Sequence, residues 1–429
     1  MTTPIMQRVP HLTTALTGPL ERLERDMLTN QAMIERWLRQ QWRETPPPLY
    51  ASVDLRNAGF KLAPVDTNLF SAGFNNLSPE FLPLCVQAAQ GVIEQAMPGC
   101  ARILLIPENH TRNAYYFESL ATLRDILLKA GYEVRIGSLL EDLKEPKEFP
   151  LEKSQRTILL EPIERVGKRI KVGDFSPCFL LLNNDLSSGV PAILQDLEQP
   201  IMPPLALGWD KRLKTNHFKH YANVSAEFAK LINIDPWFID PYFRRCEDVD
   251  FLKREGEDCL VKHTEELLAQ IQKKYDEHNI TLKPFVVIKA DAGTYGMGVL
   301  TVNSAEEIRT LNRKKRTNMS MAKGNRPITQ VMLQEGVYTF ETWQDAVAEP
   351  VVYMIGQHVV GGFYRVHTER DVNENLNAPG MQFVPLAFVQ ACNTPQQHCT
   401  PDDCANRFYS YGVIARLALL AAAREQSEV

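Results

Sequence analysis

The segment from residue 284 to residue 302 constrains the fold of this chain most strongly. It reads Pro-Phe-Val-Val-Ile-Lys-Ala-Asp-Ala-Gly-Thr-Tyr-Gly-Met-Gly-Val-Leu-Thr-Val. Residues 285–288 and 299–302 are mostly the branched and aromatic residues that favour strands. Lys289 follows the first run, and three glycines lie in the loop after it: Gly293, Gly296 and Gly298. Because glycines let a backbone turn tightly and present N–H groups to an anion, the segment predicts a hairpin folded over nucleotide phosphates, with the lysine beside them.

Two better-known phosphate-binding loops do not fit this segment. A Walker loop needs Gly-Lys-Ser/Thr at the start of a helix, and the only Gly-Lys dipeptide of the chain, at Gly167, is followed by Arg169. A dinucleotide-binding loop needs a third glycine that enters a helix, whereas the residues after Gly298 have the composition of a strand. The segment alone fits an ordinary hairpin equally well, so the phosphate interpretation depends on the rest of the chain.

Size and composition exclude several classes of protein. A length of 429 residues suggests about three domain-sized units, and 44% hydrophobic with 23% charged residues is ordinary for a globular enzyme. The net charge of −5 argues against a general nucleic-acid binder, and no apolar run approaches the roughly 20 residues that span a bilayer. The N-terminus lacks the basic-then-apolar order of a secretory signal. Eight cysteines occur without a Cys-x-x-Cys pair, so we expect free thiols in a reducing cytoplasm.

The first 80 residues divide into a helical part and a β-rich part. Apolar residues recur at helical spacing over residues 11–43, and three prolines at 46–48 end that pattern. Two β-type runs follow at residues 50–55 and 61–67. They are joined through Asn57-Ala-Gly, which is a hairpin signal.

From residue 81 onward strands and helices alternate, and this predicts a small parallel α/β domain. The expected elements are a strand at 101–107, a helix at 116–130, strands at 132–136 and 177–182, and a helix near 192–197. Residues 141–172 are charged and irregular, which indicates surface hairpins or loops.

The second half combines helices with β-type runs on both sides of the glycine hairpin. Helices are expected at 211–232, 261–276 and about 407–424, and β-type runs at 328–336 and 351–366. We therefore divide the chain into a helical segment (1–45), a hairpin (46–80), a parallel α/β domain (81–208) and a nucleotide-binding core (209–429).

The order of motifs in this second half resembles the ATP-grasp ligases. Those enzymes carry a lysine strand with a glycine-rich hairpin, which Lys289 and the loop after it match. They then carry a strand with a carboxylate at the adenine end, where this chain has Gln334 and Glu335. A second nucleotide lysine usually stands at a helix start, where this chain has Lys211. The resemblance implies that these residues bind ATP.

Two further motifs of that family have counterparts near the end of the chain. Residues 361–366, which include Arg365, resemble its arginine strand, and residues 373–380, which include Asn375, resemble its asparagine–glycine loop near the transferred phosphate. The closing hairpin that holds two Mg²⁺ in that family has no counterpart after Gly380.

A hairpin similar to the missing one lies near the N-terminus. Asp54, a glycine turn and then Asp66-Thr-Asn68 follow one another in the expected order, although the family has Glu where Asp66 stands. Alternation along a strand puts Asp66 and Asn68 on one face, and Mg²⁺ favours oxygen ligands that it shares with phosphates. We expect these three side chains to hold two Mg²⁺ in an α/β fold with a circularly permuted ATP-grasp-like core. The alternative is a surface hairpin whose Asp and Asn are turn residues.

Over nearly its whole length the chain is similar to the proteobacterial family of glutamate–cysteine ligases. The resemblance rests on residues 52–77, which begin Ser-Val-Asp-Leu-Arg-Asn-Ala-Gly-Phe-Lys, and on residues 288–299. It implies a cytoplasmic enzyme that joins the γ-carboxylate of glutamate to the amine of cysteine through an acyl phosphate, in the first step of glutathione synthesis. Another ATP-grasp carboxylate–amine ligase and a non-catalytic nucleotide-binding regulatory protein remain as alternatives.

The implied mechanism assigns roles to a few charged side chains. Lys289 and Arg365 would neutralise the charge that develops on the transferred phosphoryl group and the acyl oxygen. No protein nucleophile is required, so the cysteines need not be catalytic. The expected partners are the two small amino acids, with no nucleic acid and no membrane.

Five polar residues are candidates for recognising the amino-acid substrates. Arg56 and Lys61 flank the proposed metal ligands, and Asn375 belongs to the loop near the phosphate. Arg112 and Asn183 follow predicted parallel strands, and ligands bind beyond the carboxyl ends of such strands. Solvated charges, capping residues and turn residues explain them equally well.

Two other clusters point to no site. The basic run at residues 313–316 lies beside the nucleotide hairpin of an acidic protein, which favours a basic loop over a nucleic-acid site. A second cluster matches no zinc-site spacing: Cys392, His398, Cys399 and Cys404.

Overall fold

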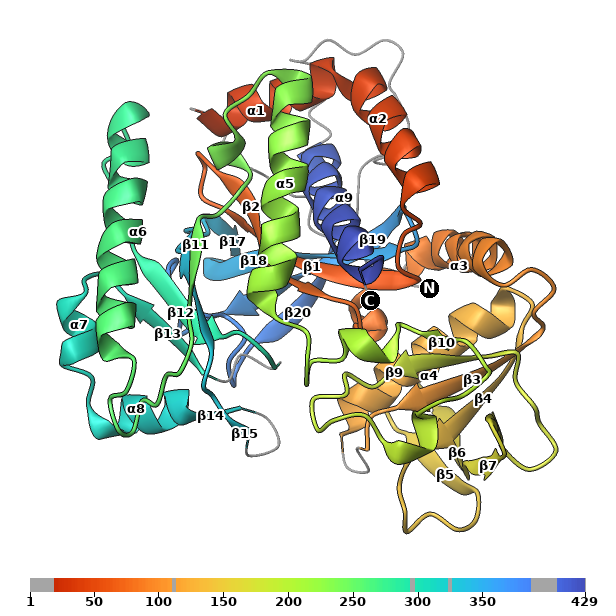
Figure 1. Ribbon diagram of the computed structural model, residues 1–429. Coiled ribbons are helices and arrows are strands. Elements are labelled where there is room, and N and C mark those ends of the chain that lie inside the picture. The colour runs from red at the N-terminus through yellow and green to blue at the C-terminus, as the bar shows by residue number, and fades with distance from the viewer. Residues whose placement is uncertain (1–18, 110–112, 294–297, 323–325, 387–406, 429) are drawn as a thin grey trace, which may run out of the picture.

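Three sheets organise the part of the chain that the structure describes, which is residues 19–109, 113–293, 298–322, 326–386 and 407–428. Figure 1 shows this computed structural model, in which helices cover each sheet. The mixed α/β fold expected from the sequence is confirmed.

The central sheet combines strands from both ends of the chain. Its order is β2-β1-β18-β19-β20, with β17 paired to β18. Its strands are β1 (Tyr50–Asn57), β2 (Leu62–Asn68), β17 (Glu341–Trp343), β18 (Ala346–Ile355), β19 (His358–His367) and β20 (Gln382–Leu386). β1 lies antiparallel between β2 and β18, so that Asp54 stands opposite both Asp66 and Val351. The N-terminal hairpin thus shares one sheet with strands from the last quarter of the chain.

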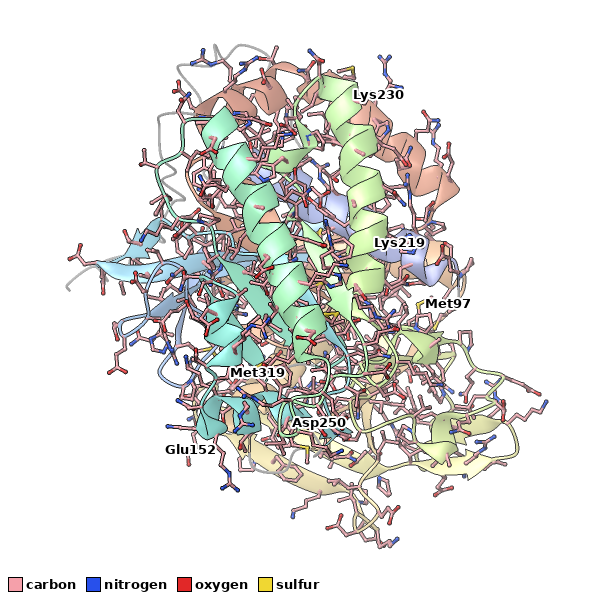
Figure 2. The ribbon with its side chains drawn as sticks, turned by 60° about the vertical axis from the view of Figure 1, so that its left-hand side comes forward. Met97, Glu152, Lys219, Lys230, Asp250 and Met319 are labelled. Atoms are coloured by element: carbon pink, nitrogen blue, oxygen red, sulfur yellow. A yellow bond between two sulfur atoms is a disulfide. The ribbon has the colours of Figure 1, made fainter. Side chains whose placement is uncertain are left out.

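Four helices cover one face of the central sheet: α1 (Pro19–Thr29), α2 (Gln31–Glu44), α5 (Lys214–Ile232) and α9 (Arg407–Gln426). The helix expected at 407–424 is therefore confirmed, and the helical opening is two helices that meet at Asn30, with residues 11–18 outside the described part. The outer face of α5 carries exposed lysines such as Lys219 and Lys230 (Figure 2).

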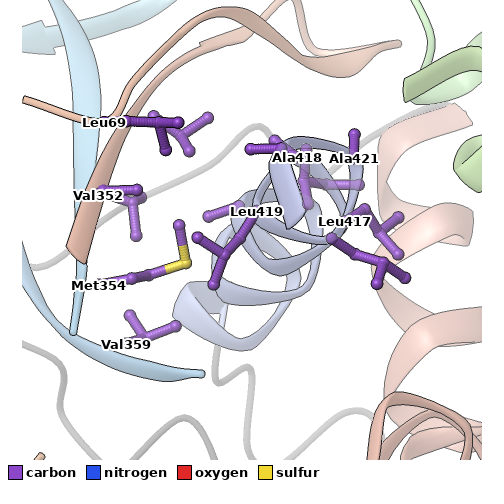
Figure 3. Packing of buried hydrophobic residues seen from close by; sticks show 14 of the residues in the cluster. Leu69, Val352, Met354, Val359, Leu417, Ala418, Leu419 and Ala421 are labelled. Atoms are coloured by element: carbon purple, nitrogen blue, oxygen red, sulfur yellow. The ribbon is translucent and has the colours of Figure 1, made fainter. Parts of the chain in front are cut away.

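Helix α9 is the centre of the largest hydrophobic core. Its residues 408–423 are all buried, because apolar and small side chains occupy every side of the helix. Figure 3 shows Leu419 directed toward Val352 and Met354 of the sheet, while Leu417 points away toward the covering helices. A helix buried on all sides in this way ties the sheet to the layer above it.

The second sheet is the parallel domain expected from the alternating pattern. Its order is β10-β9-β3-β4-β6-β5, and every pair is parallel except the edge pair β5–β6. The strands are β3 (Arg102–Pro107), β4 (Glu133–Ser138), β5 (Lys147–Leu151), β6 (Arg156–Pro162), β9 (Phe179–Asn183) and β10 (Ile201–Met202). Helices α3 (Leu82–Ala96) and α4 (Ala114–Lys129) pack beside it, and a small hairpin joins β7 (Glu164–Val166) to β8 (Arg169–Lys171).

The prediction of a helix near residues 192–197 is wrong. That segment holds only one 3₁₀ turn, Ala192–Leu194, and Asp196 has a φ of +53°. So few residues between Pro191 and Pro200 cannot repay the cost of nucleating an α-helix.

The third sheet carries the glycine hairpin. Its order is β11-β16-β12-β13, all antiparallel, and it consists of β11 (Phe243–Cys246), β16 (Val331–Glu335), β12 (Val286–Ala290) and β13 (Val299–Val302). Helix α6 (Glu257–Glu277) packs against it, and α7 (Glu306–Arg309), α8 (Arg313–Ser320), β14 (Met321–Ala322) and β15 (Arg326–Pro327) follow β13. The basic run at 313–316 is therefore the start of a helix rather than a loop.

The expectation of free thiols is wrong for one pair of cysteines. Cys246 and Cys259 form a disulfide with a Cα–Cα distance of 6.2 Å, which lies within the usual range for such bonds. Three other described cysteines are free: Cys85, Cys100 and Cys178. Sequence spacing could not reveal the pair, because one partner lies on a strand and the other on the helix packed against it.

Among the described residues, we find no helix with the length and apolar character needed to cross a membrane.

A buried ion pair fixes the end of α9, and breaking it is expected to destabilise the protein. Arg212 Nε and Nη2 donate to the two carboxylate oxygens of Glu425 at 3.0 and 2.9 Å, and both side chains are almost fully buried. Glu425→Ala leaves the guanidinium buried without its partner, so we expect the free energy of unfolding to fall by about 3 kcal/mol. Urea unfolding measures this loss.

An exposed pair on the same helix supplies the control. Arg424 pairs with the half-exposed Glu227 at 2.7 Å, and Glu227→Ala should cost less than about 1 kcal/mol. Equal losses for the two variants would show that burial does not strengthen the Arg212–Glu425 pair.

Candidate active site

A cavity of about 360 Å³ is lined by residues of all three sheets. The central sheet contributes carboxylates and an arginine, the glycine-hairpin sheet contributes Lys289 and Gln334, and the parallel domain contributes polar side chains beyond β3 and β9. Clefts of this size that join apolar walls to a few charged groups are where small ligands bind.

The predicted metal-binding hairpin faces this cavity. Asp54 on β1 and Asp66 on β2 are directly paired in the antiparallel register, and both line the cavity. Burial raises the pKa of Asp54, and the carboxylates of Glu349 and Asp66 add to that rise, although Arg365 opposes it. For Asp66 burial also acts to raise the pKa, but Lys214 and Lys289 outweigh it, so the net shift is downward. The cavity therefore holds close negative charges that an added cation would stabilise.

Asn68 lies beside these carboxylates, but its oxygen already has partners. Asn68 Oδ1 accepts a hydrogen bond from the backbone N–H of Phe70 at 2.9 Å and lies 3.4 Å from Trp209 Nε1. Its side chain would have to exchange these bonds before it could coordinate a metal.

Two buried lysines lie beside the carboxylate hairpin. Lys289 Nζ donates to the backbone oxygen of Val65 at 2.6 Å. Lys214 Nζ donates to the backbone oxygen of Gly293 at 2.8 Å and lies 3.8 Å from Asp66 Oδ1. Gly293 has a φ of +100°, which favours glycine. Both ammonium groups are thus next to the carboxylate hairpin, at the base of the predicted phosphate loop.

The structure places Lys214, not Lys211, at the cavity. Lys211 is exposed in the turn before α5, and the helix begins three residues later. Asp291 anchors that helix start, because its carboxylate accepts from the backbone N–H and the hydroxyl of Thr215 at 2.8 and 2.7 Å. The sequence pattern missed Lys214 because the helix start was expected too early.

If Lys289 binds the phosphates of ATP, as the sequence predicts, its depressed pKa should make the affinity for ATP depend on pH. Burial, with help from Lys214 and Arg56, lowers the pKa of Lys289 to about 8, although Asp66 opposes the shift. As pH rises through about 8, the lysine loses the charge that attracts phosphates. Affinity for ATP should therefore be level below pH 7 and fall above pH 8 by up to about tenfold per pH unit. Calorimetric titration from pH 6.5 to 9.5 measures this.

The variant Lys289→Arg tests whether this lysine causes the fall. A guanidinium stays charged across that range, so its affinity should vary less with pH than that of the natural protein. An affinity that stays constant up to pH 9.5 in the natural protein would contradict the assignment.

Gln334 and Glu335 stand at the other end of the cavity. The Glu335 carboxylate is held by Lys61 Nζ at 2.9 Å and by Trp237 Nε1 at 3.0 Å. Lys61 is fully buried, pairs with Glu335 and is not among the residues that line the cavity. Gln334 Nε2 is buried without a hydrogen-bond partner among the described residues. Such a donor is costly to leave unpaired, and it is available to a ligand.

An arginine–glutamate network spans the centre of the cavity. Arg365 Nη1 donates to Asp54 Oδ2 at 2.8 Å and also bonds Glu349, which in turn accepts from Arg56 Nε at 3.0 Å. Arg56 also bonds the backbone oxygens of Val337 and Glu374, so most of its donors are used within the chain. Arg365 Nε has no partner among the described residues.

Glu349 is a cavity residue that sequence reasoning missed. The sequence predicts one β-type run over residues 351–366, whereas two strands meet there at a turn that contains Gly356 (φ +52°). A glutamate in an otherwise apolar stretch just before that run, Ala-Val-Ala-Glu-Pro-Val-Val, was the available signal.

The part of the cavity wall that belongs to the parallel domain is polar. Asn183, at the carboxyl end of β9, donates from Nδ2 to the backbone oxygen of Ser71 at 2.9 Å. Its Oδ1 is buried without a partner among the described residues. Asn113, Tyr116 and Ser119 line the same end.

The cavity lining includes most of the residues that the sequence indicated: Asp54, Arg56, Asp66, Asn68, Lys289, Gly293, Gln334, Glu335, Arg365 and Asn375. Three others are not part of the lining: Lys61, Lys211 and Gly298. Gly298 follows the loop with a φ of +64°, and a Cβ there would come within 2.5 Å of Ile328. Arg112, Gly296 and the cluster of Cys392, His398, Cys399 and Cys404 lie outside the described residues.

Comparisons with known proteins point to one family. A family model described as glutamate-cysteine ligase matches residues 24–426. A crystal structure from Methylobacillus flagellatus KT, of a protein provisionally assigned as gamma-glutamylcysteine synthetase, is 56% identical with a TM-score of 0.90. It covers 98% of this chain and 99% of that one. No protein of curated function matches the sequence.

A more distant structure carries less information. A glutathione synthetase-like effector from Globodera pallida is 10% identical over 86% of this chain and 80% of that one. Its TM-score is 0.35, too low to support an argument.

Proposed function

The chain belongs to the glutamate–cysteine ligase family, and from this we propose which of its side chains hold ATP, metal and amino acids. Enzymes of this family join glutamate to cysteine at the expense of ATP, in glutathione synthesis. The observation that carries our assignment is that Lys214 and Lys289 lie beside Asp66 at the cavity, while Arg365 bonds the neighbouring Asp54.

We assign ATP to the space between the central sheet and the glycine-hairpin sheet. Lys289 and Lys214 would neutralise its phosphates, and the loop that contains Gly293, Gly296 and Gly298 would cover them. Gln334, whose Nε2 lacks a partner within the described structure, and the backbone beside Glu335 are suited to the adenine end.

Asp54 and Asp66 are the proposed metal ligands. Burial raises the pKa of Asp54, and the carboxylates of Glu349 and Asp66 add to that rise. A divalent cation such as Mg²⁺, which prefers oxygen ligands, would stabilise the ionised form of Asp54 beside Asp66. Asn68 would join them after releasing Phe70 and Trp209. Among the described residues, Asp54 and Asp66 belong to no cluster of three or more metal-ligand side chains. The phosphates of ATP would therefore supply the remaining ligands of two Mg²⁺ ions. Bound Mg²⁺ would neutralise charge on the transferred phosphoryl group.

The reaction consists of two displacements. The γ-carboxylate of glutamate attacks the γ-phosphorus of ATP and releases ADP. The amine of cysteine then attacks the acyl carbon and releases phosphate, and one amine proton is lost to solvent. Arg365, with Nε unpaired among the described residues, would bind the acyl oxygen as charge develops there. Asp54 and Glu349 hold that guanidinium in place.

We place the amino acids toward the parallel domain. The free acceptor of Asn183 suits an α-ammonium group, and Asn375 lines the same cavity. Arg112, which lies outside the described residues, stays a candidate for a substrate carboxylate. Arg56 is better assigned to positioning Glu349, and Lys61 to holding Glu335.

We also propose that residues 46–80 and 209–429 form one permuted ATP-grasp-like core. Support comes from the pairing of β1 with β18 and from the contact of Lys289 with Val65, next to Asp66. Since the enzyme consumes ATP, we propose that it works in the cytoplasm.

Measuring ADP release with ATP and Mg²⁺ tests the assignment of substrates. We expect turnover only when glutamate and cysteine are both present, with γ-glutamylcysteine identified by mass. Turnover with a different acid and amine would favour another ligase. ATP binding without turnover on any pair would favour the regulatory alternative.

A further inference from the structure

A second group of ligand-type side chains lies away from the catalytic cavity, on the other face of the glycine-hairpin sheet. It consists of Cys246, Cys259 and His263. His263 Nδ1 lies 3.3 Å from Cys246 Sγ and 3.6 Å from Cys259 Sγ. The three ligand atoms lie within 4.8 Å of one another, and none of these residues lines the cavity.

The local sequence places these side chains together. Along β11 the side chains alternate, so Arg245 reaches Asp291 at 3.2 Å on one side while Cys246 is buried on the other, toward α6. Helix α6 starts after Gly256 (φ +74°), which puts Cys259 in its first turn. His263 follows four residues later and therefore lies on the same helix face.

We propose that Cys246, Cys259 and His263 bind one zinc ion when the disulfide is reduced. Two molecules of a small thiol reduce the Cys246–Cys259 bond, giving two cysteine thiols and one small-molecule disulfide. Zinc then displaces a proton from each thiol and accepts the lone pair of His263 Nδ1, whose ring proton stays on Nε2. Atoms and charges balance, with two protons released per ion bound.

The geometry and the ligand chemistry both favour zinc over magnesium. Sulfur and nitrogen ligands at tetrahedral zinc stand about 3.5 Å apart, and the two distances from Nδ1 already have that value. Thiolate and imidazole are ligands for zinc, whereas magnesium selects oxygen. Three protein ligands leave the fourth position to solvent, and Cys259 and His263 are partly exposed, which provides an entry path. The ion would fasten α6 to β11 as the disulfide does.

Cobalt titration of the full-length protein tests this proposal without relying on activity. The reduced protein, with all eight thiols counted, is titrated with Co²⁺ alone in the absence of nucleotide. We expect one equivalent to give the near-ultraviolet charge-transfer band of a cobalt–thiolate bond, and Zn²⁺ to remove it. The oxidised protein should give no band. Zn²⁺ should also raise the unfolding temperature of the reduced protein only.

Three variants decide which residues are responsible. Cys259→Ser should abolish the band, and His263→Gln should weaken cobalt binding by at least about tenfold. Cys178→Ser, at a free cysteine of similar exposure outside the cluster, should leave it unchanged. If Cys259→Ser fails to fold, His263→Gln alone answers the question. A reduced protein without the band, a disulfide that survives millimolar reductant, or a band lost in Cys178→Ser would overturn the proposal.

Discussion

Asp66→Asn is expected to lower kcat on the order of a thousandfold while the protein stays folded. The substitution keeps the shape of the side chain but removes the charge that lies 3.8 Å from Lys214 Nζ and also acts on Lys289. Two effects then combine. The proposed metal loses a charged ligand, and both lysines lose the carboxylate that favours their protonated forms. Steady-state kinetics at saturating amino acids measures kcat.

The dependence on Mg²⁺ separates a metal ligand from a merely structural residue. In Asp66→Asn the concentration of Mg²⁺ that gives half-maximal rate should rise at least about tenfold, which a packing defect would not cause. Asp174, whose side chain is 89% exposed beside Arg135, offers the matched change. Asp174→Asn should keep full activity. If Asp66→Asn keeps more than a tenth of the natural kcat, Asp66 is not a ligand of the catalytic metal.

Local patterns predicted the parts of the site that depend on short stretches of chain. The strand that ends in Lys289 and the loop glycines needed only the composition of residues 284–302 to be identified. The hairpin of Asp54 and Asp66 needed only period-two alternation and a glycine turn, and the observed register pairs these two residues directly. Both are contained in fewer than about 20 residues, so their geometry follows from strand and turn preferences.

Long-range pairing determines the contacts of two residues whose roles the local sequence leaves open. Arg56 and Lys61 are candidates for substrate contacts in the sequence because they flank the proposed metal ligands. Their partners, Glu349 and Glu335, are 293 and 274 residues away. A single sequence does not say which distant strand a segment joins, so it cannot say whether a charge faces a ligand or another buried charge.

Lys289→Met is expected to lower kcat/KM for ATP by about a thousandfold, or about 4 kcal/mol. Methionine fills nearly the same space but cannot neutralise phosphate, and the loss should be seen in ATP binding as well as in turnover. The free energy of unfolding, in contrast, should not fall. Burial pushes the pKa of Lys289 down to about 8, which means that the folded state disfavours its charge at neutral pH. The variant should therefore resist urea at least as well as the natural protein at pH 7.

This opposition between activity and stability distinguishes a ligand-binding lysine from a structural one. A lysine that held the fold through Val65 would lose stability on substitution, and activity would fall only in proportion to unfolding. Lys283→Met, at an exposed lysine just before β12, should change neither quantity. A destabilised Lys289→Met protein with normal affinity for ATP would assign Lys289 to the fold, and would leave Lys214 as the cation that meets the phosphates.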